Sequence, residues 1–168
     1  MNKIGLFYGS TYGMTRKVAE QIKTAFKNFQ VDLHDVKHTS AEQLSRYDFL
    51  IFGTSAWGVG EMQDDWKQWI SAVEKFDFTG KKVALFGLGD QVKFPESFAD
   101  GLGKLYRCIS DRSVIKGKWP LKGYRYQSSL AEKDGTFVGL VLDENNQKEQ
   151  TKERIKQWVS QVEKEFLS

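Results

Sequence analysis

Short apolar runs alternate with amphipathic helical patterns along most of this chain, and this alternation constrains the fold more than any other feature. The runs at residues 3–8, 48–53 and 82–88 are apolar nearly throughout, as strands covered on both faces of a sheet require. A helical pattern follows each run, with apolar residues recurring at spacings near 3.6. Repeated strand–helix units of this kind predict an α/β fold with a mostly parallel sheet.

The expected elements leave no linker, internal repeat or low-complexity tract between them. Strands are predicted at residues 3–8, 31–36, 48–53, 82–88, 114–119 and 137–142. Helices are predicted at residues 15–29, 40–47, 61–75, 96–109 and 147–166. The sequence therefore predicts one domain over residues 1–168, in which a stretch at about 120–136 is inserted into the last strand.

Composition narrows the function classes. The 168 residues are 40% hydrophobic, enough for one full core, and no apolar run reaches about 18 residues. No leader pattern is present, so we expect a soluble, cytoplasmic protein. The single cysteine, Cys108, excludes a disulfide framework and is expected to be a buried helix residue. His34 and His38 lack further ligands at metal-binding spacing and are expected on the surface.

The formal net charge of +3 is too small and too dispersed to indicate a nucleic-acid-binding protein. Basic residues do gather at 116–125 and at 148–156, and we interpret both groups as solvated surface.

Ligands of parallel α/β sheets bind at the carboxyl ends of the strands, where the strand order reverses. The loops at residues 9–15, 54–60 and 89–95 follow the first, third and fourth predicted strands. These three loops are therefore the candidate ligand site.

The first loop, GSTYGMT at residues 9–15, has the features of a site for a single phosphate. A helix N-terminus offers backbone N–H groups to an anion, and Gly9 and Gly13 let the backbone wrap closely around a small group. The lysine of a nucleotide-triphosphate loop is absent because Met14 follows the second glycine, and the spacing of a dinucleotide loop is absent too. The alternative is an ordinary helix start capped by Ser or Thr.

The second and third loops each carry an aromatic residue beside glycine or proline. Trp57 and Phe94 could form the walls of a slot for a flat ring, by stacking worth about 1–3 kcal/mol per ring. Asp90 and the backbone amides of residues 88–90 would then meet the polar edge of the ring. The alternative is that Trp57 folds down onto the core.

At these loops the chain resembles a flavodoxin of the long-chain subgroup. FYGSTYGMT is similar to the phosphate loop of that family, AWGVGEMQDDW to the loop with the inner tryptophan, and GLGDQ with Phe94 to the loop with the outer aromatic residue. The insertion after Trp119, ending in FVGLVLDENNQ, is similar to that of the long-chain subgroup, and the resemblance runs from Ile4 to about Phe166. Flavodoxin is itself a standard example of strand order 2-1-3-4-5 with FMN at the switch point.

The resemblance implies a three-layer sandwich, a five-stranded parallel sheet with helices on both faces, and a low-potential one-electron carrier with non-covalently bound FMN. Such a carrier is not an enzyme and needs neither catalytic residues nor a metal. Trp57 and Phe94 would enclose the isoalloxazine, and the Gly58 carbonyl would turn toward its N5. The implied FMN-binding residues are Ser10, Thr11, Tyr12, Gly13, Met14, Thr15, Ser55, Ala56, Trp57, Gly58, Val59, Gly60, Leu88, Gly89, Asp90, Phe94, Ser97, Phe98 and Asn145.

The implied partners are redox proteins: an NADPH-dependent flavoprotein or iron–sulfur reductase as donor and electron-accepting enzymes as acceptors. The carrier would act as a monomer in transient complexes, without nucleic acid or membrane. We expect the insertion at 120–136 to contact these partners, and its deletion to leave FMN affinity largely intact.

The chain departs from the family pattern at several positions. The family usually has tyrosine where Phe94 stands, a small hydroxyl residue at Tyr12 and often aspartate at Asn145, and its members are usually acidic. Two alternatives on the same fold stay open: an FMN-dependent reductase of quinones or nitro compounds, and a cofactor-poor regulatory binding protein. A phosphate-receiver domain is excluded because the expected strand ends lack its carboxylates. A cysteine phosphatase is excluded because Cys108 lies outside the phosphate loop.

Overall fold

A parallel sheet forms the middle layer of the computed structural model, which describes residues 1–57, 61–109 and 111–168. Its strand order is β10–β5–β3–β1–β2, which is the order 2-1-3-4-5 when the five strands are counted along the chain. The predicted fold class is thereby confirmed. The strands are β1 (Asn2–Tyr8), β2 (Phe29–Asp35), β3 (Phe49–Trp57), β5 (Lys82–Leu88) and β10 (Leu140–Leu142).

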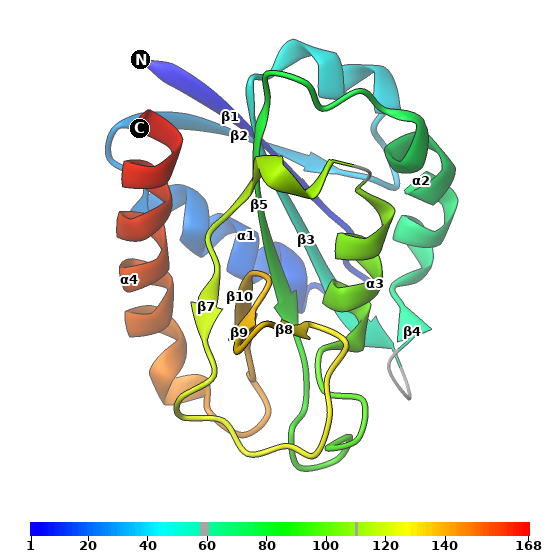
Figure 1. The fold of residues 1–168 in the computed structure, drawn as a ribbon, viewed down its shortest axis with the longest axis vertical. Helices are drawn as coiled ribbons and strands as arrows, with labels where there is room; N and C mark the ends of the chain where they lie inside the picture. The colour runs from blue at the N-terminus through cyan, green and yellow to red at the C-terminus, as the bar shows by residue number, and fades with distance from the viewer. Residues whose placement is uncertain (58–60, 110) are drawn as a thin grey trace.

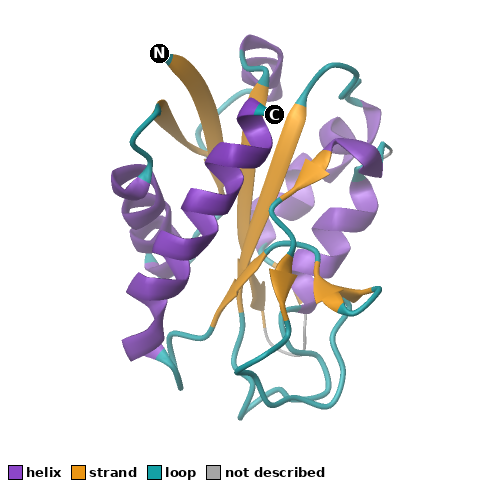
Figure 2. Ribbon diagram, turned by 60° about the vertical axis from the view of Figure 1, so that its left-hand side comes forward, coloured by secondary structure: helices purple, strands orange, loops and turns teal. Residues whose placement is uncertain are grey.

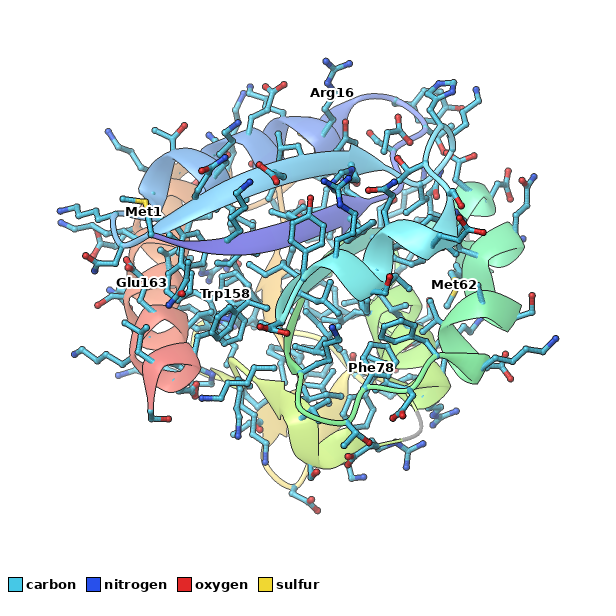
Figure 3. The ribbon with its side chains drawn as sticks, turned by 90° about the horizontal axis from the view of Figure 1, so that it is seen from above. Met1, Arg16, Met62, Phe78, Trp158 and Glu163 are labelled. Atoms are coloured by element: carbon cyan, nitrogen blue, oxygen red, sulfur yellow. The ribbon has the colours of Figure 1, made fainter. Side chains whose placement is uncertain are left out.

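Helices cover both faces of this sheet, as Figures 1 and 2 show. On one face lie α1 (Met14–Ala25) and α4 (Lys148–Leu167), and on the other lie α2 (Asp64–Lys75) and α3 (Asp100–Cys108). Trp158 of α4 and Phe78, both almost fully buried, fill the core on the two sides of the sheet (Figure 3). No helix in the described part of the chain is both long and apolar enough to cross a membrane.

The ends of the helices differ most from the predictions, because single residues with non-helical backbone conformations set where a helix begins or ends. After α1, Phe26 turns extended and Phe29 enters β2, where it packs edge-on against Phe49 with ring centroids 5.2 Å apart. The helix predicted at 96–109 begins only at Asp100, because Ala99 has a left-handed conformation (φ 54°). The predicted helix at 40–47 is a short 3₁₀ helix, η1 (Ala41–Arg46).

The insertion splits the last strand into two pieces that both pair with β5. β6 (Ile115–Lys116) pairs with its first half, Ile115 opposite Val83, and β10 with its second half, Leu140 opposite Phe86. The insertion, defined here as residues 117–139, is longer than the predicted 120–136. Within it, β7 (Trp119–Pro120), β9 (Thr136–Phe137) and β8 (Glu132–Lys133) form a small antiparallel sheet, and η2 (Arg112–Val114) precedes β6.

The insertion packs closely on α3. A Cβ at Gly103 would lie only 2.3 Å from the backbone of Leu130, so glycine is needed at this position. The Leu130 N–H also donates to Oδ1 of Asp100 (2.8 Å). Cys108, at the end of α3, is only half-buried, and burial raises the pKa of its thiol.

His34 is not the surface residue that the sequence predicted, whereas His38 is exposed as expected. The His34 ring stacks on Phe7 with centroids 4.7 Å apart, and its Nε2 lies 2.7 Å from the Tyr47 hydroxyl. Because Tyr47 donates its proton to Asp32 (3.0 Å), Nε2 of His34 is the donor in this pair. Burial lowers the pKa of His34.

A pH dependence of stability follows from this lowered pKa. Below the ordinary histidine pKa of about 6.5, the unfolded chain binds a proton that the folded His34 resists, so stability falls as the pH falls. We expect the free energy of unfolding to drop between pH 7.5 and pH 5.5, and His34→Gln to reduce that drop. Urea denaturation at the two pH values measures it. His38→Gln is the matched control, and an equal change in both variants would contradict the expectation.

Candidate functional site

The first, second and third loops meet at the carboxyl edge of the sheet, as predicted. The Gly9 N–H donates to the Gly53 carbonyl (3.2 Å), which joins the end of β1 to β3. Ser55 of β3 stands opposite Leu88 of β5, and the Gly89 N–H donates to the Leu142 carbonyl (3.0 Å). Hydrogen bonds thus connect all the strand ends from β1 to β10.

The first loop ends in an open helix N-terminus. Gly13 is the N-cap residue with a left-handed φ of 83°, and a Cβ built on it would meet nothing within 4 Å. The first hydrogen bond of α1 runs from the Lys17 N–H to the Gly13 carbonyl (3.0 Å). The preceding N–H groups therefore have no acceptor within the helix, and the N-cap residue is Gly13 rather than the Ser or Thr of the alternative.

The side chains of this loop differ in exposure. Tyr12 is 83% exposed and Met14 is 40% exposed, whereas Thr15 is buried in the first turn of α1. Two hydroxyl oxygens accept hydrogen bonds from the protein: Ser10 Oγ from the Arg16 N–H (3.4 Å) and Thr11 Oγ1 from a side chain at the start of α2.

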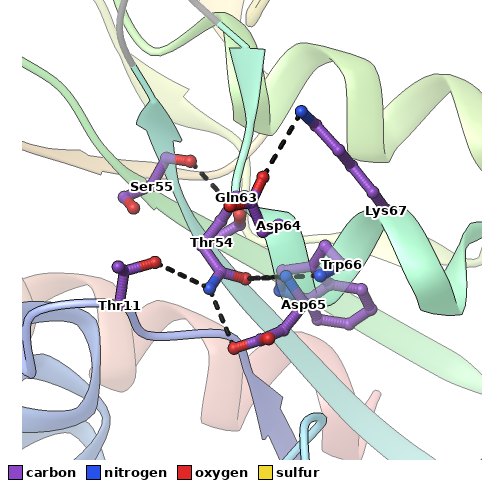
Figure 4. A network of polar contacts seen from close by, with 8 residues as sticks. All are labelled: Thr11, Thr54, Ser55, Gln63, Asp64, Asp65, Trp66 and Lys67. Carbon is purple, nitrogen blue, oxygen red and sulfur yellow. Dashed lines mark hydrogen bonds and ion pairs between the residues drawn. The ribbon is translucent and has the colours of Figure 1, made fainter.

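That side chain is Gln63, which the sequence analysis did not single out (Figure 4). It is 1% exposed and caps α2 by accepting the N–H groups of Asp65 (3.0 Å) and Trp66 (3.3 Å). Its Nε2 donates to Thr11 Oγ1 (3.0 Å) and to Asp65 Oδ2 (2.9 Å). One buried amide thus ties the first loop to the start of α2. Glutamine is not among the favoured N-cap residues, so no sequence rule identified it.

Gly9 has a different role from the predicted one. A Cβ at Gly9 would lie 2.2 Å from Gln63 Oε1 and 2.8 Å from the Trp66 ring. The Trp66 indole in turn donates to the Gly53 carbonyl (2.7 Å). Gly9 therefore leaves room for the start of α2, whereas Gly13 gives the first loop its left-handed turn.

The second loop is shorter than predicted because β3 continues to Trp57. Ala56 pairs with Met62, and Trp57 with Glu61, in the two-residue strand β4 (Glu61–Met62). Thr54 is fully buried, and its hydroxyl donates to the Ser55 carbonyl (3.3 Å).

The predicted residues Gly58, Val59 and Gly60 lie outside the described residues, and of Ala56 and Trp57 only the backbone is described. The aromatic wall at Trp57 and the turned peptide at Gly58 therefore stay predictions.

Asp90, predicted to meet the polar edge of the ring, accepts hydrogen bonds within and around the third loop. Its carboxylate accepts the N–H groups of Lys93 (2.9 Å) and Val92 (3.1 Å). It also accepts the side-chain amides of Asn146 (2.8 Å) and Asn145 (3.1 Å). Burial alone would raise the pKa of Asp90, but these hydrogen bonds hold it below the usual range. Asn145, predicted to bind FMN, thus donates its side-chain amide to Asp90, and its contact with FMN stays a prediction.

A second carboxylate, Asp143, lies fully buried behind the third loop and was missed by the sequence analysis. Its Oδ2 accepts the backbone N–H (3.1 Å) and the side-chain amide (2.8 Å) of Gln91. Its Oδ1 accepts the N–H groups of Asn145 (3.1 Å) and Asn146 (3.0 Å). Asp143 and Asp90 together fix the third loop to the turn that follows β10.

The aromatic residues of the third loop separate into two roles. Phe94 is half-buried, with Lys93 Nζ 5.5 Å from its ring centroid, so part of its surface is available to a ligand. Phe98, in contrast, is fully buried, with its ring centroid 5.2 Å from that of Tyr126. Phe98 supports the loop from inside the core, so the prediction that it lines the site is wrong.

The remaining predicted residues lie at the base of this loop. Leu88 is almost fully buried at the end of β5, and Ser97 is half-buried. A Cβ at Gly89 would lie 2.9 Å from the Ala99 nitrogen, so the chain passes close to the start of α3 here.

Comparison with known proteins places this geometry in a family. The flavodoxin family model matches residues 6–158. The chain is 46% identical over 168 residues to a flavodoxin of Synechococcus elongatus, covering 99% of both chains. It belongs to the flavodoxin family. Flavodoxins are electron-transfer proteins and not enzymes, which excludes the reductase alternative at the level of the family.

Further relatives agree. A flavodoxin of Haemophilus influenzae is 40% identical over 161 residues, 95% of this chain and 92% of that one. The crystal structure of Fusobacterium nucleatum flavodoxin bound to flavin mononucleotide superposes with a TM-score of 0.90 at 33% identity, covering 99% of both chains.

In this chain, the insertion holds the third loop by hydrogen bonds. The Arg125 N–H donates to Gln91 Oε1 (2.6 Å), and the N–H groups of Gln127 and Ser128 donate to the Pro95 carbonyl (2.7 and 3.1 Å). The expectation that its deletion leaves FMN affinity intact is at odds with these contacts. That the insertion contacts redox partners stays a prediction.

Proposed function

We propose that this chain binds FMN non-covalently as a single domain and carries one electron at a time at low potential between redox proteins. The observation that carries the proposal is its likeness, over 99% of both chains and at 33% identity, to a flavodoxin crystallised with flavin mononucleotide. FMN, when bound, supplies the redox chemistry, and the chain's residues bind it, orient it and exclude water.

The first loop suits the FMN phosphate because two of its hydroxyl groups can donate hydrogen bonds to an anion. Ser10 Oγ and Thr11 Oγ1 each accept a hydrogen bond from the protein, so each O–H proton is left to donate to an anion. The N–H groups of the first turn of α1 and the positive end of its dipole add to this. The left-handed Gly13 leaves the approach open.

The ring of FMN would lie against the second and third loops. Half-buried Phe94 provides one apolar wall, and we assign the other to Trp57. Asp90 and Asp143 act as positioning residues, because they fix the loop whose backbone at residues 88–90 meets the polar edge of the ring. Such a site needs no general acid, base or nucleophile, since outer-sphere electron transfer breaks no bond in the protein.

The partners we propose are an NADPH-dependent flavoprotein reductase or an iron–sulfur reductase as donor and redox enzymes as acceptors. The complexes would be transient, with the chain as a monomer. Its cytoplasmic location stays a prediction.

Stepwise anaerobic reduction of the purified protein, followed by its visible spectrum, tests the function. We expect a yellow protein that turns blue after one electron and pale after the second. A protein that passes from yellow to colourless without a blue stage would contradict the one-electron carrier function. A preparation that stays colourless when FMN is added would contradict FMN binding altogether.

Replacing Thr11 with valine tests the phosphate site. The variant removes the hydroxyl at nearly constant shape, so we expect FMN to bind about tenfold more weakly, equivalent to about 1.4 kcal/mol. Fluorescence titration of the apoprotein with FMN measures this, and riboflavin, which has no phosphate, should show little change. Thr24→Val, at the other end of α1, is the matched control. Equal FMN affinity in Thr11→Val and the native chain would exclude the role of Thr11.

A further inference from the structure

A hollow of about 310 Å³ lies between the end of α3, η2, β6 and the small sheet of the insertion. Figure 1 shows β8 of this sheet beside α3. Tyr106, Arg112, Lys116, Lys118, Lys133 and Asp134 line it, and we call it the basic hollow.

The basic hollow lies away from the proposed FMN site. Lys116 pairs with Ala84, in the first half of β5, whereas the FMN loops begin after Leu88. At about 3.3 Å per residue, these two positions are about 13 Å apart along the strand.

Four cationic side chains and one carboxylate line this hollow, so it holds a net charge of +3, as large as the excess of the whole chain. The cations come from three separate segments: η2, the stretch 116–118 and the hairpin of β8 and β9. None of the four forms an ion pair with any residue in the described part of the chain. Like charges gathered in a concave surface repel one another and attract anions.

Tyr106 orders two of the cations. The Arg112 guanidinium lies 5.2 Å from the ring centroid, and Lys133 Nζ lies 5.3 Å from it, so both are held by cation–π contacts. A guanidinium held in this way can offer two parallel N–H donors to phosphate oxygens, while lysine acts as a point charge. A neighbouring hollow of about 350 Å³ shares Tyr106, Arg112 and Lys133 and adds Arg107, Leu130 and the carboxylate of Glu132, so its added charges cancel.

We propose that the basic hollow binds a small phosphorylated molecule that carries two or more negative charges. Its volume is at the low end of small-molecule sites, which start at about 300 Å³, and it is lined by cations rather than by the apolar side chains typical of drug-like ligands. The cations converge into a hollow instead of forming a stripe, which disfavours nucleic acid. The basic residues at 116–118, interpreted from the sequence as solvated surface, would then bind the anion.

Calorimetric titration of the FMN-saturated protein with inorganic pyrophosphate tests this proposal. FMN saturation is needed because the first loop would itself attract pyrophosphate, and flavin absorbance reports that occupancy independently. We expect saturable binding that weakens as salt is added. Amide chemical-shift changes in the native chain should fall on residues 112–118 and 132–136. Absence of binding, or shifts confined to residues 10–16, would overturn the proposal.

A pair of variants with equal charge change sharpens the test. Arg112→Gln combined with Lys133→Gln should weaken pyrophosphate binding about tenfold or more, while Lys23→Gln combined with Lys75→Gln, on α1 and α2, should change it little. All four side chains are exposed, so both variants should fold. Equal weakening in both would show a general charge effect and overturn the proposal. Citrate binding as tightly as pyrophosphate would overturn the assignment to phosphates.

Discussion

Replacing Asp143 with alanine is expected to lower the free energy of unfolding by about 4 kcal/mol. The carboxylate is fully buried and accepts hydrogen bonds from Gln91, Asn145 and Asn146. Hydrogen bonds to a charged group are worth about 1.5–3 kcal/mol each, and the desolvation of the carboxylate offsets part of their sum. The variant also leaves buried N–H groups without an acceptor. Urea denaturation of the apoprotein measures the loss.

FMN binding should weaken in the same variant, because the third loop loses its attachment to the turn after β10. Asp143→Asn, which keeps the shape but loses the charge and one acceptor, should lie between the native chain and the alanine variant in stability. Asp48→Ala is the control, since that carboxylate is 83% exposed and pairs only distantly with Lys81 (3.8 Å). We expect a change of at most about 0.5 kcal/mol there. A loss below about 1 kcal/mol in Asp143→Ala would show that the network is not needed for stability.

Replacing Gln63 with alanine should cost about 3 kcal/mol of stability, because a buried helix cap and the link to Thr11 are lost together. FMN affinity should fall about tenfold or more, since Thr11 is then no longer held in place. Denaturation of the apoprotein and FMN titration separate the two effects. Gln68→Ala, exposed on the same helix, is the matched control.

Gln63→Glu separates the effect of the amide N–H donors from the effect of the size of the side chain. The substitution keeps the size of the side chain but replaces two N–H donors with an oxygen beside Asp65 and Thr11. We expect FMN affinity to fall further than in Gln63→Ala, and added salt to recover part of it, because a carboxylate there would repel the phosphate. Tighter binding in Gln63→Glu than in Gln63→Ala would contradict this.

The structure also changes the interpretation of the chain's positive charge. The side chains that line the basic hollow beside α3 carry a net charge of +3, so a large part of the excess lies away from the loops proposed to bind FMN. On the FMN side, the carboxylates of Asp65 and Asp90 are engaged by hydrogen bonds from the protein. Local charge is therefore a better guide to the partners of this flavodoxin than the net charge is.

Most of the sheet could be predicted from the sequence. Strand β5 was predicted with its exact bounds, and its burial on both faces explains why: every position from Val83 to Leu88 is apolar or glycine. The three candidate loops were placed at one edge for the same reason, since an apolar run has a clear end and parallel strands bring their ends together. The insertion and the helix ends were less accurate, because single backbone conformations such as that of Ala99 decide them.

The sequence by itself thus determined the fold class, the family resemblance and the sheet edge at which the candidate loops meet, because all three depend on local periodicity and short motifs. Only the tertiary structure showed that Gln63 holds Thr11 and that Asp143 holds Gln91, two pairs that are each 52 residues apart. It also placed Phe98 in the core and gathered the cations of the basic hollow from three segments. The physical reason is the strand order: contacts between loops arise when β1, β3, β5 and β10 become neighbours, and no local pattern records which distant side chains then meet.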